Sequence, residues 1–234
     1  MYYKKVLLSY KTPSEVKEVL ENLGVEVIPT TIHRNISREI CDHADMQIAK
    51  ICEDLFVCSP ELYNYYKPIL NKKLMCGSTS LKCNYPYDIA YNIARVGGYA
   101  FHNIKYTDSY VLNLLKNQGV KIVNVSQGYT KCNMCIVGNA VITSDEGIYQ
   151  KCVSLGIRTL KIRQGHITLD GYDYGFIGGA SGMISNDTVF FAGDIESHPD
   201  FKEIKDFLYA VNVKFIFVPN TPLVDIGSVI GFGI

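Results

Sequence analysis

The feature that most constrains the fold of this chain is a pattern in which a short apolar strand leads into an amphipathic helix and then into a second strand. It occurs five times in the 234 residues. Helices are predicted at residues 13–23, 60–70, 109–118, 146–155 and 199–211. Each predicted helix ends at Gly or Asn, roughly every 50 residues, which is near the range of repeat architectures. The sequence therefore predicts an α/β fold of five similar modules.

The first of these predicted helices illustrates the physical reasons for the pattern. Thr12 and Glu15 have the spacing of a capping box, and Val16 and Leu20 belong to an apolar stripe of helical period. Gly24 then supplies the left-handed residue that commonly ends a helix. Comparable acidic capping residues stand before the third and fourth helices, at Asp108 and Asp145.

An additional extended piece precedes four of the five units. These pieces are residues 42–49, 88–95, 131–137 and 178–183, and they are rich in small and polar side chains. The first unit lacks one, but the C-terminal segment 225–231 reads as a strand with no helix after it. We therefore expect one module to be split between the two ends of the chain. Pairing the last strand with the first module would leave no open sheet edge there.

Four segments carry a family resemblance: HADMQI at residues 43–48, QGYTKC at 127–132, ITSDEG at 142–147 and GYDYGFIGG at 171–179. Together with the five modules, they resemble the pentein fold of guanidino-group-modifying enzymes, and more narrowly an uncharacterised bacterial family of that amidinotransferase-like fold. The resemblance covers essentially the whole chain. It implies one domain over residues 1–234, a five-bladed pseudosymmetric α/β propeller of strand-strand-helix-strand modules closed by the C-terminal strand.

The composition indicates which kinds of partner and which cellular compartment are to be expected. Lys and Arg number 23, and Asp and Glu also number 23, so the formal net charge is zero. A chain without net positive charge has no overall electrostatic attraction for nucleic acid or an anionic membrane. The N-terminus has no apolar signal segment, and the eight cysteines follow no disulfide framework. We expect a cytoplasmic protein with reduced thiols and no cofactor, and the sequence leaves its oligomeric state open.

Polar side chains gather on the extended pieces that should converge on the axis of such a ring. The candidates are Asp42, His43, Asp45, Asp88, Asn92, Lys131, Cys132, Cys135, Asp173, Ser181, Asp225 and Ser228. On a strand His43 and Asp45 would point to one face, where a carboxylate could orient the imidazole. An equally weighted alternative is that His43 caps a turn and Asp45 accepts backbone hydrogen bonds.

The resemblance implies catalysis by a cysteine thiolate that attacks a guanidinium carbon, with a histidine for proton transfer. Two departures stand against that mechanism. No cysteine follows Cys152, so Ser228 lies in the segment that matches the enzymes' nucleophile, and Ser185 and Asn186 stand where their histidine falls. A displaced nucleophile at Cys132 or Cys135, served by His43, is the catalytic alternative.

A metal or redox site is the other interpretation of Cys132 and Cys135. Residues three apart on a strand face opposite sides, and a second pair of ligands at metal spacing is missing. We therefore expect no metal at these cysteines.

Two classes of function remain. The first is a central-channel site for a small cationic metabolite, guanidino- or amine-bearing, bound by Asp45, Asp88, Asn92, Asp173, Asp225 and Ser228. The second is a non-catalytic ring that binds a macromolecule, as in the sixth eukaryotic initiation factor. A hydrolase or amidinotransferase with the displaced cysteine is a variant of the first. Carboxylates concentrated on presumed channel strands favour the channel ligand, because unneeded carboxylates usually lie on solvated faces.

Overall fold

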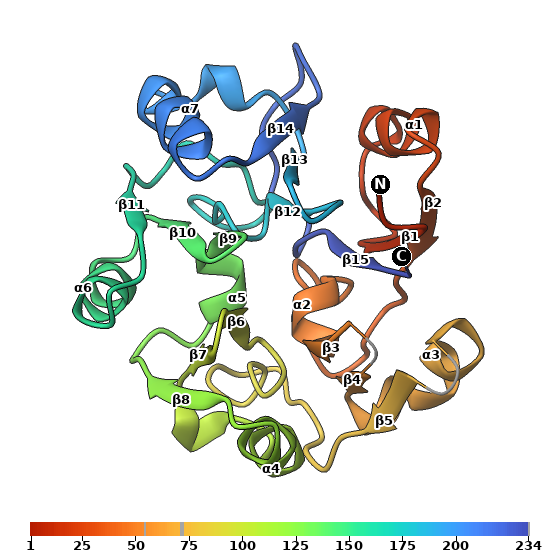
Figure 1. The fold of residues 1–234 in the computed structure, drawn as a ribbon. Helices are drawn as coiled ribbons and strands as arrows, with labels where there is room; N and C mark the ends of the chain where they lie inside the picture. The colour runs from red at the N-terminus through yellow and green to blue at the C-terminus, as the bar shows by residue number, and fades with distance from the viewer. Residues whose placement is uncertain (54, 71–72, 234) are drawn as a thin grey trace.

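The computed structural model describes residues 1–53, 55–70 and 73–233. Its elements form five modules (Figure 1), each a three-stranded sheet with one main helix. The first module contains β15 (Ile230–Phe232), β1 (Lys5–Leu8), α1 (Ser14–Asn22) and β2 (Glu26–Pro29). The second contains β3 (Ile48–Cys52), β4 (Leu55–Cys58), the 3-10 turn η1 (Pro60–Leu62), α3 (Tyr63–Leu70) and β5 (Leu74–Cys76).

The other three modules repeat this order. The third contains β6 (Ala94–Val96), β7 (Tyr99–His102), α4 (Ser109–Asn117) and β8 (Lys121–Asn124). The fourth contains β9 (Cys135–Val137), β10 (Ala140–Thr143), α6 (Glu146–Ser154) and β11 (Thr159–Lys161). The fifth contains β12 (Ser181–Met183), β13 (Thr188–Phe191), α7 (Phe201–Ala210) and β14 (Lys214–Phe217). Two short helices, α2 (Ala44–Gln47) and α5 (Thr130–Asn133), precede β3 and β9.

Every sheet has the same internal topology. Its first strand is antiparallel to the second, and the second is parallel to the third, which follows the helix. In the fifth module, for example, Ser181 pairs with Phe191 and Val189 pairs with Phe215. Figure 1 shows the five sheets arranged around a common centre with the main helices outside. The predicted strand-strand-helix-strand module is therefore present five times.

The C-terminal strand completes the first module. β15 pairs antiparallel with β1, matching Phe232 to Lys5 and Ile230 to Leu7. The two ends of the chain accordingly lie close together in Figure 1. This pairing agrees with the split module expected from the sequence, and it gives β1 a hydrogen-bonding partner on both sides.

Residues at the helix ends behave largely as predicted. Gly24, Gly119, Gly156 and Asn212 all have positive φ angles after their helices, whereas Asn71 lies outside the described residues. Asp108 and Asp145 cap α4 and α6 by accepting from the amides three residues on. The capping box at Thr12 was a wrong prediction. Pro13 occupies the flanking position itself, so Thr12 lies one residue too far out, and its hydroxyl has no hydrogen-bond partner among the residues that the structure describes.

The strand of each sheet that lies nearest the centre is called its inner strand here: β15, β3, β6, β9 and β12. The pieces before the inner strands were also predicted wrongly. Residues 42–49 and 131–137 are not continuous strands, because a helical turn, α2 or α5, comes before the strand. Likewise β15 begins at Ile230, and the preceding Gly227 and Ser228 have φ angles of 69° and 71°. Most of the polar candidates therefore lie in turns that lead into the inner strands.

Apolar packing joins neighbouring modules. Val16 and Leu20 of α1 share a buried cluster with Phe190 of the fifth module, and Val111 of α4 shares one with Val57 of the second. Each fully buried Leu, Val or Phe side chain contributes roughly 1.5–3 kcal/mol. These clusters hold the inner strands, and the turns before them, in fixed positions. Within the described residues, no helix has the length and apolar character needed to span a membrane.

Candidate functional site

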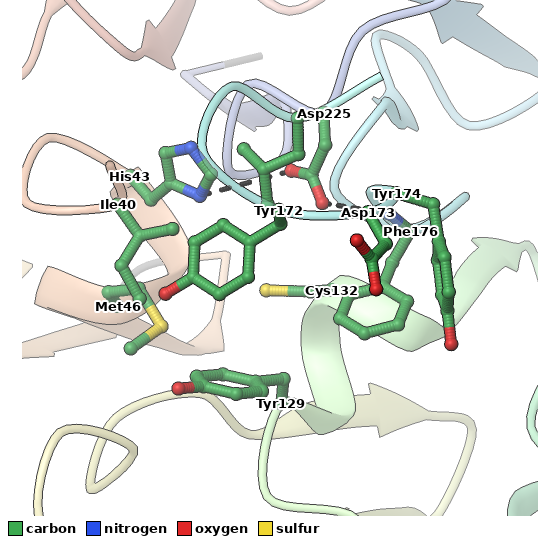
Figure 2. A pocket seen from close by; sticks show the side chains of 11 residues that line it. Ile40, His43, Met46, Tyr129, Cys132, Tyr172, Asp173, Tyr174, Phe176 and Asp225 are labelled. Atoms are coloured by element: carbon green, nitrogen blue, oxygen red, sulfur yellow. Dashed lines mark hydrogen bonds and ion pairs between the residues drawn. The ribbon is translucent and has the colours of Figure 1, made fainter. Parts of the chain in front are cut away.

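A cavity of about 240 Å³ opens where the turns before the inner strands meet, and Figure 2 shows its side chains. Its polar lining consists of His43, Cys132, Asp173 and Asp225, and its aromatic lining of Tyr129, Tyr172, Tyr174 and Phe176. Ile40, Met46 and Leu169 complete it. The cavity thus combines titratable groups with a mainly apolar wall, which is typical of a small-molecule site.

Cys132 is positioned by the single turn of α5. The Thr130 hydroxyl donates to the Gln127 carbonyl at 2.7 Å, and the Asn133 side chain donates to the Tyr129 carbonyl at 2.9 Å. The side-chain oxygen of Asn92 accepts from the amide of Lys131 at 2.7 Å. These bonds fix a turn too short to be stable by itself and direct the Cys132 side chain toward the cavity.

The thiol of Cys132 donates a hydrogen bond to a carboxylate. Its Sγ lies 3.1 Å from Oδ2 of Asp45 and accepts from Nδ2 of Asn92 at 3.1 Å. Burial, together with the negative charges of Asp45 and Asp225, raises the pKa of Cys132 well above its ordinary value. At neutral pH the residue is therefore a protonated thiol.

Asp45 connects this thiol to a serine and a lysine. Its Oδ2 accepts from the Ser228 hydroxyl at 2.5 Å, and Lys131 Nζ donates to the same Ser228 oxygen at 2.9 Å. The other carboxylate oxygen of Asp45 is buried without a hydrogen-bond partner among the described residues. Ser228 adopts its left-handed backbone without being glycine, a conformation that persists only where surrounding contacts enforce it.

Asp225 and His43 form the second polar group of the cavity. The carboxylate of Asp225 accepts from the amides of Phe176 at 2.9 Å and Gly227 at 3.0 Å. Nδ1 of His43 lies 3.8 Å from its Oδ1. Burial raises the pKa of Asp225; the nearby His43 opposes that shift and the nearby Asp45 adds to it.

Glycine is required where backbone passes against this carboxylate. A Cβ atom at Gly179 would overlap the carboxylate of Asp225, and one at Gly227 would overlap the side chain of His43. The repeated glycines of residues 178–182 therefore allow close approach of chain segments at the centre of the molecule.

The structure brings several predicted residues together and separates others. His43, Cys132, Asp173 and Asp225 line the cavity, while Asp45, Asn92 and Ser228 lie behind it in contact with Cys132 or with one another. The predicted shared face of His43 and Asp45 on a strand is wrong, because His43 precedes α2 and Asp45 lies in the single turn of that helix. The side chain of His43 does not cap α2, and no backbone amide is found among the donors to the Asp45 carboxylate within the described chain.

Asp88 and Cys135 belong neither to the cavity lining nor to the group of residues behind it. Asp88 accepts from the hydroxyl of Tyr129 at 2.8 Å, and burial raises its pKa. Cys135 lies on β9 in an apolar cluster with Val137 and Ile142, where burial raises its pKa to about 11. Of the two cysteines, it is Cys132 that faces the cavity.

The aromatic wall was missed by sequence reasoning. Tyr129, Tyr172, Tyr174 and Phe176 all stand in the segments QGYTKC and GYDYGFIGG, which carry the family resemblance. The signal was their clustering with Asp173 in loop sequence, since aromatic residues in a loop often serve recognition.

No metal centre is evident in residues 1–53, 55–70 and 73–233. This part of the chain contains no group of three or more His, Cys, Asp or Glu side chains placed to hold a metal ion.

Solved structures with the same fold are guanidino-group enzymes. A cysteine-to-serine variant of DDAH from Pseudomonas aeruginosa, complexed with citrulline, has a TM-score of 0.59 at 9% identity and covers 94% of this chain and 93% of its own. An amidinotransferase from Microseira wollei in the saxitoxin biosynthetic pathway gives 0.56 at 10% identity, covering 97% and 96%. A cysteine-to-serine variant of agmatine deiminase from C. jejuni, with substrate bound, gives 0.54 at 11% identity, covering 99% and 93%. The fold of this chain is thus the pentein fold.

The family is shown by sequence. The model of a family of unknown function, DUF6873, matches residues 7–230, so the chain belongs to that family. The comparison with curated proteins gave no match.

Proposed function

We propose that the central cavity binds a small metabolite with a cationic guanidino or amine group. In this account the five sheets act as the blades of a propeller, and the cavity is one mouth of its axial channel. This proposal rests on an excess of carboxylates over basic side chains in the cavity wall. Asp173 and Asp225 both face the cavity, and the lining defined by the described residues includes no lysine or arginine.

The buried carboxylate supplies the strongest preference for a cation. Asp225 is 3% exposed, and its contacts are two backbone amides and the ring of His43 at 3.8 Å. Burying a carboxylate is costly unless a positive group compensates it. A guanidinium or ammonium group in the cavity would provide that compensation through charge-assisted hydrogen bonds.

The aromatic wall supports the same ligand. Tyr129, Tyr172, Tyr174 and Phe176 surround the space in front of Cys132 (Figure 2). Faces of aromatic rings attract cations by about 0.5–2 kcal/mol each, depending on desolvation. Carboxylates combined with several rings therefore favour a flat or compact organic cation over an anion. The pentein neighbours support this choice of ligand class, because they include an agmatine deiminase with substrate bound.

A second candidate is covalent chemistry at Cys132, favoured by the hydrogen bond from its thiol to Asp45. Asp45 could accept the thiol proton while Sγ forms a bond to the guanidinium carbon of the ligand. Because burial raises the pKa of Cys132, the thiol rests in its protonated form and this proton transfer would accompany the attack. The C–N bond of the resulting tetrahedral adduct would then break, and His43, which lies in the same cavity, would donate the proton with which the amine leaves.

A thermal-shift comparison tests the binding proposal. Agmatine and arginine should raise the melting temperature, whereas citrulline, in which a neutral ureido group replaces guanidinium, should have a smaller effect. Equal shifts from arginine and citrulline would show that the guanidinium group is not recognised, because both compounds also carry an α-ammonium group. No shift from any of these ligands or from polyamines would favour the non-catalytic, macromolecule-binding ring.

A further inference from the structure

A second cavity, of about 410 Å³, lies at the centre of the five modules and shares no lining residue with the first. The inner strand of every sheet contributes to it, through Ile51, Arg95, Ile136, Met183 and Ile230. Lys131 lines this cavity, while the next residue, Cys132, lines the first. Its volume is that of a metabolite pocket rather than of a single water site.

The charge of the second cavity is opposite to that of the first. Lys50, Arg95 and Lys131 line it, and the acidic member of its lining in the described chain is Glu53. Lys50 Nζ contacts Glu53 Oε1 and the Gly231 carbonyl, each at 2.8 Å. Besides Lys50 in this ion pair, the lining contains two further cations, Arg95 and Lys131.

Arg95 and Lys131 have no carboxylate within ion-pair distance in the part of the chain that the structure describes. Arg95 donates to the carbonyl of Ile51 and to the side chain of Gln118, and Lys131 donates to the hydroxyl of Ser228. All of these partners are neutral. Both side chains are only partly exposed, so water compensates their charge less than on an open surface.

We propose that the second cavity binds a small organic polyanion, one that carries phosphoryl groups or several carboxylates. The planar guanidinium of Arg95 suits either group, and the ammonium groups of Lys50 and Lys131 add point charges on other sides of the same space. Three cations from three modules line a volume too large for a single chloride or orthophosphate ion to fill.

Calorimetric titration with citrate and with pyrophosphate tests this at physiological salt. We expect at least one of them to bind the wild type with a dissociation constant below about 1 mM. Arg95→Gln and Lys50→Gln should each weaken that binding about tenfold or more, since each removes a charge-assisted contact. The two ligands distinguish carboxylate from phosphoryl recognition.

Arg158→Gln is the matched control, because Arg158 is exposed and bonded to the Ala210 carbonyl away from the cavity. Asp173→Asn should also leave polyanion binding unchanged, which separates this site from the first cavity. If Arg95→Gln fails to fold, Lys50→Gln carries the comparison. The proposal is overturned if neither polyanion binds, or if Arg158→Gln weakens binding as much as the cavity variants do.

Discussion

Sγ of Cys132 lies 3.1 Å from Oδ2 of Asp45, although the two residues come from different modules, 87 positions apart. The thiol donates and the carboxylate accepts, so the pair is stable only while Cys132 is protonated. This relationship predicts low intrinsic reactivity for a cysteine that nonetheless faces the first cavity. It also ties the chemistry of the thiol to the charge of Asp45.

Iodoacetamide labelling should therefore be slow at Cys132 in the native protein. The exposed residues Cys76 and Cys83 should be labelled first, as read by peptide mass spectrometry. Asp45→Asn removes a negative charge that raises the pKa of Cys132, so labelling at a fixed pH should accelerate, by about tenfold for each unit of pKa change. Asp187→Asn, at an exposed surface position, should change nothing. Rapid labelling of Cys132 in the wild type would contradict the assignment of a resting thiol.

The backbone at the centre of the molecule should tolerate no side chain at Gly179. Gly179→Ala would place a methyl group against the Asp225 carboxylate and displace it, so both stability and binding of a cationic ligand should fall. Gly98→Ala is the matched control, because a Cβ there meets no atom within 4 Å. Melting temperatures of the two variants, with and without agmatine, make the comparison. A Gly179→Ala protein indistinguishable from Gly98→Ala would show that this close approach has no consequence.

Much of the fold can be predicted from the sequence because short local patterns indicate the helix and strands of each module. The apolar stripe of α1 and the glycine after it are signals within one helix, and they predict its bounds to within two residues. The turns that form the site carry no such signal. α2 and α5 have four residues each, too few to show a helical period, and contacts such as that between Asn92 and the amide of Lys131 hold α5 in place.

The composition of the site was predictable only in part for the same reason. His43, Cys132 and Asp225 could be chosen because buried polar side chains near the axis are unusual. Their pairing could not be chosen, because it depends on how separate turns meet. The predicted partner of His43 was Asp45. In the structure Asp225 lies beside the His43 ring, and Asp45 accepts a hydrogen bond from Cys132.

The C-terminal strand should be essential for stability. Phe232 is 5% exposed and packs edge-on against Phe56 with ring centroids 5.9 Å apart. Phe232→Ala should cost about 3–5 kcal/mol of unfolding free energy and lower the melting temperature by roughly 10 °C. Tyr209→Ala, at a side chain that is 60% exposed, should shift it little. Similar melting temperatures for the two variants would mean that β15 does not secure the first module.

Buried His102 should make stability fall in mild acid. Burial lowers the pKa of His102 from 6.5 to about 4, so between these values the unfolded chain binds a proton that the folded chain excludes. Its stabilising contribution is present above pH 6.5 and is lost as the pH falls toward 4, by about 3 kcal/mol in total. Urea unfolding across this range should show a flatter pH dependence in His102→Phe and an unchanged one in His166→Gln, where the ring is exposed. A slope that persists in His102→Phe would assign the effect to other groups.

Binding of a cation by the carboxylates of the first cavity can be measured by calorimetric titration of agmatine into the wild type, Asp173→Asn and Asp170→Asn. Both carboxylates are exposed and stand three residues apart on one loop, but Asp173 lines the cavity and Asp170 lies outside that lining. The account predicts saturable binding to the wild type, unchanged by Asp170→Asn and weakened roughly tenfold by Asp173→Asn. Absence of binding to the wild type, or equal weakening by both substitutions, would contradict it.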